Sequence, residues 1–320
     1  MSVLDIKMQL IMKLRKLRKK PKFKKFWCKK YTFKDLNYAI VRNYDELIEF
    51  AKKNKKTANF CHELNRQNLE EGLKEGELDG YCCLCNKKTK LGWKIRPLYS
   101  NNILFTEVLW HKKCHMFNRQ RAMIHLFKIF EKSMPKNKTI YLYEQTTLFY
   151  EHFKNLWGDD NEIIGSEYMG WDKTPGEIIN GIRHEDSINL SFKDNSLDYM
   201  ISNDVFEHVP DIEKTLSEAK RCLKSGGKLM IRMPVEWNRE KTFKRAEFKD
   251  GKIEYLAEKV FHGGFQHDGN DGSLLVYNYG RDVFDIIKKA GFKDAYGVAI
   301  MDEKYGYISY DPITIFICEK

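Results

Sequence analysis

Two pairs of potential metal ligands occur in the first half of this 320-residue sequence. Cys82 and Cys85 are separated by two residues, and His111 and Cys114 repeat that spacing 25 residues later. Paired Cys and His ligands on tight turns are typical of tetrahedral zinc sites. Because four protein ligands fill a tetrahedral shell, the pattern predicts a structural Zn²⁺ site. The alternative is that the two pairs are unrelated and consist of buried thiols and surface histidines.

Two histidines are candidates for removing a proton from an acceptor hydroxyl. His208 follows a buried apolar run at 197–202, and His262 lies in a long Gly/Asp-rich segment. In open α/β sheets, ligands bind at the carboxyl ends of the strands, where His208 is expected. The alternatives are that His208 packs on the sheet at the start of a helix and that His262 is an ordinary loop residue.

The elements that would position these residues alternate from residue 138 onward. Alternation of strands and helices predicts a mostly parallel sheet covered by helices. Before residue 78 the sequence indicates helices, and a further helix over 124–134 would join the two halves. Strands are predicted at 139–144, 163–167, 182–185, 197–202, 227–233, 294–300 and 312–318, and helices at 147–156, 175–182, 211–224 and 280–291.

Composition limits the class of protein. An apolar content of 42% with 13% aromatic residues can support a packed core, which excludes a disordered chain. The sequence contains no apolar run near the roughly 20 residues of a membrane-spanning helix. Its basic start lacks a signal peptide's apolar region and cleavage site, so a cytoplasmic protein is expected.

The positive charge is concentrated in one segment. Residues 1–30 contain twelve Lys or Arg and a single acid, and this basic arm therefore accounts for the whole formal net charge of +11. A folded body with balanced charge argues against a broad nucleic-acid footprint. Lysines and arginines mixed with Leu, Ile, Phe and Trp predict binding to an anionic membrane surface. The alternatives are a solvated tail and nucleic-acid binding through the arm.

Two segments resemble the central motifs of class I S-adenosylmethionine-dependent methyltransferases, especially the small-molecule and sugar O-methyltransferase branch. Asn189–Asp211 contains an apolar strand and Glu-His-Val, and Cys222–Pro234 contains Leu-Lys-Ser-Gly-Gly before another strand. The resemblance covers about residues 138–320. It implies an α/β, Rossmann-like, mostly parallel seven-stranded sheet with helices on both faces. The expected division is a basic arm at 1–30, a helical and zinc-knuckle domain at 31–125 and the methyltransferase domain at 126–320.

The same resemblance assigns a binding site for S-adenosylmethionine. Glu167 ends a predicted strand, where an acid can accept both ribose hydroxyls. Asp186 lies in a segment similar to the one that contacts the adenine amino group. The family's glycine-rich loop is missing after the first strand, although Thr146 or Thr147 could still cap the next helix. The assigned residues are Glu144, Gln145, Thr146, Glu167, Tyr168, Met169, Glu185, Asp186, Ser187, Asn203, Asp204 and Val205.

The run Phe117–Ala122 after the last cysteine resembles a zinc-containing subgroup found with bacterial surface-polysaccharide biosynthesis. This resemblance implies O-methylation of a saccharide or a phosphate-bearing glycan precursor, in the cytoplasm or at the inner membrane face. One alternative is a non-catalytic zinc-containing module that binds nucleic acid or protein on a degenerate methyltransferase fold. Another is a methyltransferase that acts on RNA or protein.

Overall fold

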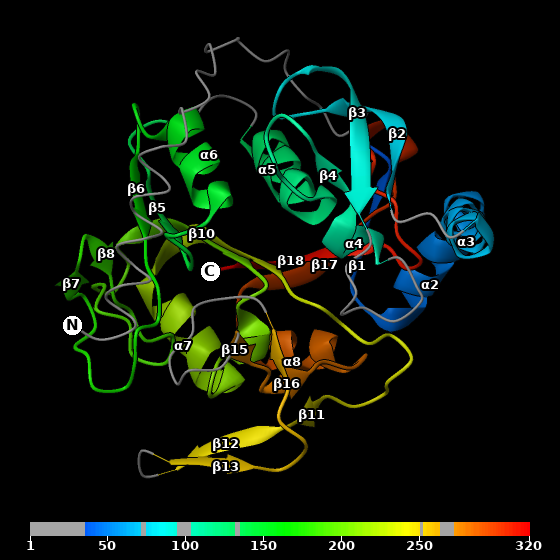
Figure 1. Cartoon of the computed structure of the whole chain (residues 1–320). Helices are drawn as coiled ribbons and strands as arrows, with labels where there is room; N and C mark the ends of the chain where they lie inside the picture. The colour runs from blue at the N-terminus through cyan, green and yellow to red at the C-terminus, as the bar shows by residue number, and fades with distance from the viewer. Residues whose placement is uncertain (1–35, 72–74, 95–103, 132–134, 250–251, 263–271) are drawn as a thin grey trace.

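A seven-stranded sheet forms the centre of the computed structural model, which describes residues 36–71, 75–94, 104–131, 135–249, 252–262 and 272–320 (Figure 1). Five of the strands run in one direction, including the second-to-last strand of the chain, and the first and last strands of the sheet in chain order run in the opposite direction. The order across the sheet is β1 (Tyr38–Val41), β17 (Asp294–Ile300), β18 (Ile313–Glu319), β10 (Leu223–Arg232), β9 (Leu197–Asn203), β5 (Thr139–Leu142) and β6 (Glu162–Gly165).

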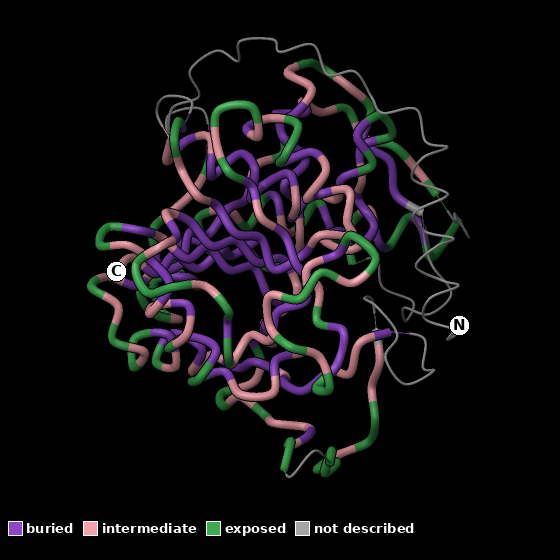
Figure 2. The backbone as a smooth tube through the Cα atoms, turned by 90° about the vertical axis from the view of Figure 1, so that its left-hand side faces the viewer, coloured by how far each residue is buried: buried purple, intermediate pink, exposed green. Residues whose placement is uncertain are grey.

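The sheet is buried on both faces because successive side chains of each strand point to opposite sides. In β5, Ile140 and Leu142 pack with helices α5 (Asn118–Phe130) and α6 (Leu148–Trp157), whereas Tyr141 packs on the opposite side. Helices α7 (Ile212–Cys222) and α8 (Val283–Lys289) cover that opposite face (Figure 1). Figure 2 shows the central strands as buried. The predicted fold class is confirmed.

One predicted helix is wrong, and the sequence contained the reason. Residues 175–182 were expected to be helical, but β7 (Ile178–Ile179) and β8 (Ile182–Arg183) form an antiparallel hairpin instead. Its two-residue turn, Asn180-Gly181, has φ values of 51° and 78°. Asn-Gly at positive φ is the preferred two-residue hairpin turn, and it overrides a weak helical pattern.

The seventh strand of the sheet comes from an unexpected part of the chain. The strand predicted near 182–185 lies in the β7–β8 hairpin, and β1 occupies the edge beside β17 instead. The N-terminal part also contains α2 (Tyr44–Lys53), α3 (Lys55–Glu71), β2 (Glu75–Cys82), β3 (Lys87–Lys94), α4 (Phe105–Val108) and β4 (Trp110–His111).

The N-terminal part and the sheet share a hydrophobic core. Cys82, Leu84 and Met116 are buried in the same cluster as the strand residues Ile140 and Ile315. The joining helix α5 begins at Asn118, six residues before its predicted start, and lies against the sheet. The metal-ligand segment is therefore packed directly on the predicted methyltransferase domain, while the boundary at residues 125 and 126 stays a prediction.

Several short strands lie between β10 and α8 in the sequence. Among the described residues these are β11 (Phe243–Lys244), β12 (Ala246–Lys249), β13 (Lys252–Tyr255), β14 (Phe261–His262), β15 (Ser273–Leu274) and β16 (Tyr277–Asn278). The β12–β13 hairpin projects from the body (Figure 1).

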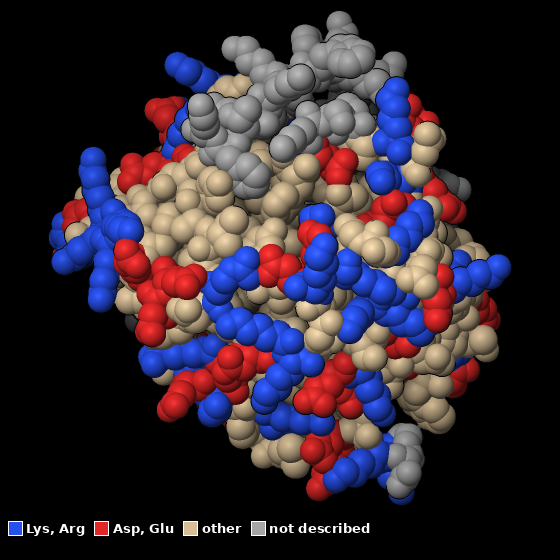
Figure 3. All heavy atoms as spheres, turned by 180° about the vertical axis from the view of Figure 1, so that it is seen from behind, with Lys and Arg blue, Asp and Glu red and all other residues tan. Residues whose placement is uncertain are grey.

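The surface opposite to the view of Figure 1 carries basic and acidic side chains interspersed with one another (Figure 3). Within the described ranges, none of the helices combines the length and apolar character that a bilayer crossing requires. The basic arm at 1–30 lies outside the described residues, so its membrane binding stays a prediction.

Candidate functional site

The four predicted metal ligands converge. The ligand atoms of Cys82, Cys85, His111 and Cys114 all lie within 4.8 Å of one another. The Sγ atoms of Cys82 and Cys114 are 4.0 Å apart, and Cys85 Sγ is 3.7 Å from His111 Nδ1. Zinc–sulfur bonds of about 2.3 Å in a tetrahedron place the sulfurs roughly 3.8 Å apart. This donor set fits a tetrahedral thiolate–imidazole metal site.

Surrounding groups orient the ligands and connect them to the rest of the protein. His111 Nε2 lies 2.9 Å from Thr89 Oγ1, so Nδ1 is the nitrogen directed at the cluster. Such an outer hydrogen bond fixes the ring of a metal-binding histidine. His152 of α6 donates from Nε2 to the carbonyl oxygen of Cys114 at 2.8 Å. The ligand segment is thus attached to the helix that follows β5.

The loop after β5 carries a buried carboxyl group. Glu144 accepts hydrogen bonds from Asn203 Nδ2, at 3.0 Å, and from the hydroxyl of Thr147. Thr147 caps α6 by accepting a hydrogen bond from the amide of Tyr150 at 3.2 Å. Of the two threonines predicted as possible caps, Thr147 and not Thr146 is therefore the cap. Burial raises the pKa of Glu144 to about 7. Asn203 Oδ1 is buried and accepts no hydrogen bond from the described residues.

Glu167 lies beside this loop at the carboxyl end of β6. Its Oε1 accepts hydrogen bonds from the amides of Gln145, at 2.9 Å, and Thr146, at 2.6 Å. Gly165 permits this close approach, because a Cβ there would lie 2.7 Å from the carbonyl oxygen of Glu144. The glycine that allows tight packing is therefore on the second strand rather than in the loop, and sequence reasoning missed it.

The β7–β8 hairpin is fastened to the same loop. Gln145 donates from Nε2 to Gly181 O at 3.0 Å, and its Oε1 accepts from the amide of Arg183 at 2.9 Å. The amide of Met169 donates to His184 Nδ1 at 3.0 Å. Met169 is buried, whereas Tyr168 is exposed and its ring lies 5.6 Å from that of His184.

The three predicted residues at 185–187 have different surroundings. Glu185 is buried, and its carboxylate accepts from Arg183 Nε at 2.6 Å and from the amide of Ser191 at 2.9 Å. Asp186 is partly buried, and its Oδ1 accepts a hydrogen bond from the amide of Ile188 at 3.1 Å. Ser187 accepts from the hydroxyl of Thr215. Glu185 therefore holds the loop, whereas Asp186 can take a further donor.

Asp204 belongs to a cluster of four charges at the ends of β9 and β10. It lies at φ 54° and pairs with Arg119 of α5, at 2.5 Å, and with Arg232 of β10. Glu107 pairs with the same two arginines, at 2.9 and 3.6 Å. Although burial opposes ionisation, the two guanidinium groups lower the pKa of Asp204 to about 2. The cluster joins the metal-ligand segment to the turn that holds Asn203 and Val205.

His208 lies three residues beyond Val205 at the same edge of the sheet. Its Nδ1 lies 2.7 Å from the carbonyl oxygen of Leu274, which can only accept. Nδ1 must therefore carry the proton in the neutral ring, and Nε2 has the lone pair that a base needs. The second candidate base, His262, pairs through its backbone with Ser273, and its side chain lies outside the described part of the structure.

Glu207, in the Glu-His-Val run, lies at the site although no role was predicted for it from the sequence. Its side chain is fully buried, and its carboxyl oxygens accept no hydrogen bond from the described residues. The Nε2 atom of His208 is 3.8 Å from Glu207 Oε1. Burial, with the charge of Asp204, raises the pKa of Glu207 well above its ordinary value.

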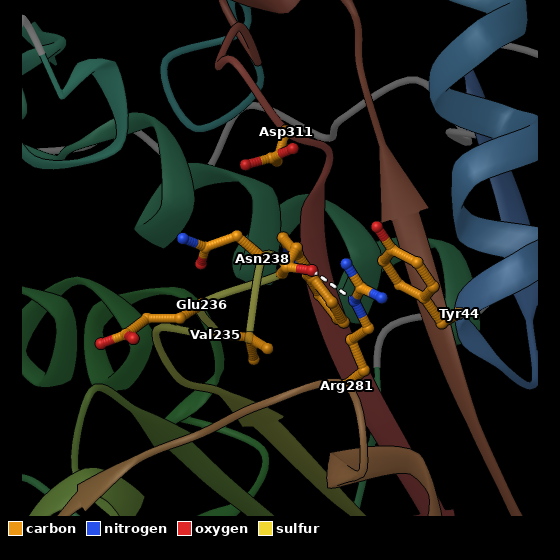
Figure 4. Close-up of a pocket in the computed structure, with 7 residues that line it drawn as sticks. Tyr44, Val235, Glu236, Asn238, Arg281 and Asp311 are labelled. Carbon is orange, nitrogen blue, oxygen red and sulfur yellow. Dashed lines mark hydrogen bonds between the residues drawn. The ribbon is translucent and has the colours of Figure 1, made fainter. Parts of the chain in front are cut away.

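A pocket of about 370 Å³ opens beyond the end of β10 (Figure 4). The rings of Tyr44 and Trp237 are stacked with their centroids 6.2 Å apart. The bridge between Val235 and Tyr279 and the hydrogen bond from the Tyr279 hydroxyl to Phe206 O connect this pocket to the His208 turn. It is lined by Tyr44, Val235, Glu236, Trp237, Asn238, Arg281 and Asp311.

Comparison with known proteins identifies the class of the central segment. Residues 166–231 match the family model described as a methyltransferase domain. This segment includes Glu167, Asp186, Asn203 and His208. The match places a methyltransferase domain in the part of the described sheet that runs from the end of β6 to β10.

The individual relatives are similar only in part. Phosphoethanolamine N-methyltransferase 2 of Caenorhabditis elegans is 46% identical over 48 residues, which are 15% of this chain and 11% of that protein. A methyltransferase structure from Mesorhizobium loti has a TM-score of 0.37 at 13% identity, covering 63% of this chain and 95% of that one. Phosphoethanolamine N-methyltransferase 2 of Haemonchus contortus has a TM-score of 0.32 at 18% identity, covering 56% and 37%.

The raised pKa of Glu144 predicts a fall in stability with rising pH. The folded protein holds the proton up to about pH 7, whereas the unfolded chain releases it near pH 4.5. Stability present below pH 4.5 is therefore lost as the pH rises to 7, by about 3 kcal/mol in order of magnitude. Urea unfolding at pH 5 to 8 should show this loss in wild type and in the exposed control Glu213→Gln, but not in Glu144→Gln. Equal pH dependence in all three would contradict the assignment.

The charge cluster predicts a large cost for removing Arg119. Arg119→Met leaves two largely buried carboxylates facing Arg232 alone, and the free energy of unfolding should fall by about 3 kcal/mol. Arg42→Met is the matched control, because Arg42 forms a two-pronged but exposed pair with Asp294 and should cost less than about 1 kcal/mol. Chemical denaturation measures both, and equal costs would show that the cluster does not stabilise the fold.

Proposed function

We propose that this chain transfers the methyl group of S-adenosylmethionine to an oxygen atom of a saccharide or a phosphate-bearing glycan precursor. The observation that carries the proposal is the arrangement at the carboxyl edge of the sheet. There Glu144, Glu167 and Asn203 converge within one hydrogen-bonded set, and the His208 turn lies between that set and the pocket beyond β10. Ligands of open α/β sheets bind at this edge.

The residues at this edge fit the cofactor. Asn203 Oδ1 is a buried acceptor that receives no hydrogen bond from the part of the chain that the structure describes, so a donor group of a bound ligand would satisfy it. Glu167 would accept from the ribose hydroxyls through the carboxylate that also anchors the loop amides. Asp186 would accept from the adenine amino group, since its carboxylate has acceptor capacity left.

The bound cofactor supplies an electrophilic methyl group on a sulfonium sulfur, and the protein must align an acceptor with it. His208 would remove the hydroxyl proton through Nε2, because the Leu274 carbonyl holds the proton on Nδ1. The carboxyl group of Glu207 lies beside this ring, with Oε1 3.8 Å from Nε2. His262 remains the alternative base.

The acceptor class rests on the resemblance and on the pocket beyond β10. Stacked aromatic rings with polar side chains around them suit the apolar faces and hydroxyls of a sugar. A second acceptor class is a small phosphate-bearing amine, which the names of two relatives suggest. Proton removal from a neutral amine would use the same base, so acceptor assays must separate the two. An RNA or protein acceptor remains a further alternative.

We also propose that Cys82, Cys85, His111 and Cys114 hold one structural Zn²⁺. The closeness of four ligand atoms and the Thr89 contact to His111 support it. Its role would be to fix the segment that leads into α5 and Arg119. The peripheral membrane role of the basic arm and the cytoplasmic location stay predictions.

Cofactor binding tests the proposal. Calorimetry with S-adenosylhomocysteine should find one site per chain, and Asp186→Ala should weaken binding by about tenfold or more through loss of a charged acceptor. Asp194→Ala is the control, since Asp194 is exposed and pairs with Arg221. Absence of binding to the wild type would favour the non-catalytic alternative, and equal affinity in both variants would remove Asp186 from the site.

Metal content tests the zinc assignment. Mass spectrometry of tag-free protein should find one zinc per chain, lost in Cys114→Ser because three ligands hold the metal less tightly. Cys83→Ala should retain it, because the Cys83 thiol faces Tyr307 and the Arg121 carbonyl instead. Metal-free protein that melts at the same temperature with and without chelator would contradict a structural role.

A further inference from the structure

We propose that the pocket beyond β10 binds an anionic group of the acceptor, a phosphate or a carboxylate, through Arg281. That the bound molecule is the methyl acceptor rests on the proposed function above. The proposal narrows the acceptor to an acidic sugar unit, with the anion on Arg281 and hydroxyl groups on the opposite wall. It follows from the fixed position of one guanidinium group and from the pairing of the charges around it.

Arg281 is held in place by neutral contacts. Its Nε donates to the carbonyl oxygen of Trp237 at 2.6 Å, and its guanidinium carbon lies 4.2 Å from the centre of the Tyr44 ring. Its backbone amide donates to Arg239 O at 2.9 Å. The stick view shows the guanidinium group beside the ring of Tyr44 (Figure 4). The plane of the group is therefore fixed before any ligand binds.

The two terminal nitrogens of Arg281 have no acidic partner within 4 Å among the described residues. Glu236, which lines the same pocket, is already paired with Arg239 at 2.8 Å and accepts from Asn278. Asp311 projects from the wall opposite Arg281 and forms no ion pair with the described chain (Figure 4). An unpaired guanidinium fork favours a phosphate or carboxylate, which it binds through two parallel hydrogen bonds.

The pocket is positioned to present a bound molecule to the reacting edge. The amide of Glu236 donates to Tyr279 O at 2.8 Å, and Tyr279 donates from its hydroxyl to Phe206 O at 2.7 Å. Phe206 begins the short turn that ends at His208. A volume of about 370 Å³ accommodates a small ligand, and Asp311 and Asn238 can accept from its hydroxyls. These features together fit a sugar phosphate or a uronic acid.

Ligand titrations test the assignment. Glucose 1-phosphate, glucuronic acid and glucose are titrated into the full chain with S-adenosylhomocysteine present. Both anionic probes should bind at least about tenfold more tightly than glucose. Arg281→Gln should remove this preference, and Arg281→Lys should restore it in part because the charge returns without the fork. Asp311→Asn should strengthen anion binding by removing a like charge. Arg42→Gln is the matched control, and it should leave the affinities unchanged.

Each contrary outcome has a distinct meaning. Equal binding of glucose and the anionic probes to wild type, or retention of the preference in Arg281→Gln that melts as wild type does, would overturn the proposal. Phosphoethanolamine binding above glucose 1-phosphate, lost in Asp311→Asn, would overturn the acidic-sugar assignment in favour of a zwitterion. Failure of the proposed function would appear separately, as absent S-adenosylhomocysteine binding while the anion preference persists.

Discussion

The salt-bridge cluster of Arg119, Asp204, Arg232 and Glu107 is the constraint on which the site depends. It contains two positive and two negative groups, so their burial leaves no net charge in the interior. Removing any one of them would leave one largely buried charge uncompensated, which is far more costly than breaking an exposed pair. The turn after β9 is therefore fixed only when the helix that follows the metal ligands is in place.

The same dependence explains why the metal-ligand segment lies on the sheet rather than apart from it. Cys114 receives a hydrogen bond from His152 of α6, and Arg119 follows five residues later. Helix α6 follows β5, and Asp204, the partner of Arg119, follows β9. The proposed cofactor would bind at the carboxyl ends of these two strands. A metal held by the four Cys/His ligands would thus act on the site through the position of α5.

Much of the fold and of the candidate site could be predicted from the sequence, and the predictions that were wrong or missing have physical causes. The strands and the metal ligands follow from local periodicity and spacing, which a single chain shows, whereas the acids at the carboxyl edge were assigned from the resemblance to methyltransferases. The role of β1 as an edge strand and the pairing of Arg119 with Asp204 depend on contacts between distant segments. The hairpin turn at Asn180-Gly181 could have been predicted from these two residues, although a helix was predicted there. The close packing of Gly165 against Glu144 appears only when two strands lie side by side.

Hydrogen–deuterium exchange with and without S-adenosylhomocysteine tests the central claim most directly, because it locates the cofactor on the sheet. The account predicts added protection at 144–147, 167–169 and 203–205, at the carboxyl ends of three neighbouring strands. The amides of β1, at the far edge of the sheet, should be unchanged. Protection confined to other segments, or no change at all at saturating ligand, would contradict it.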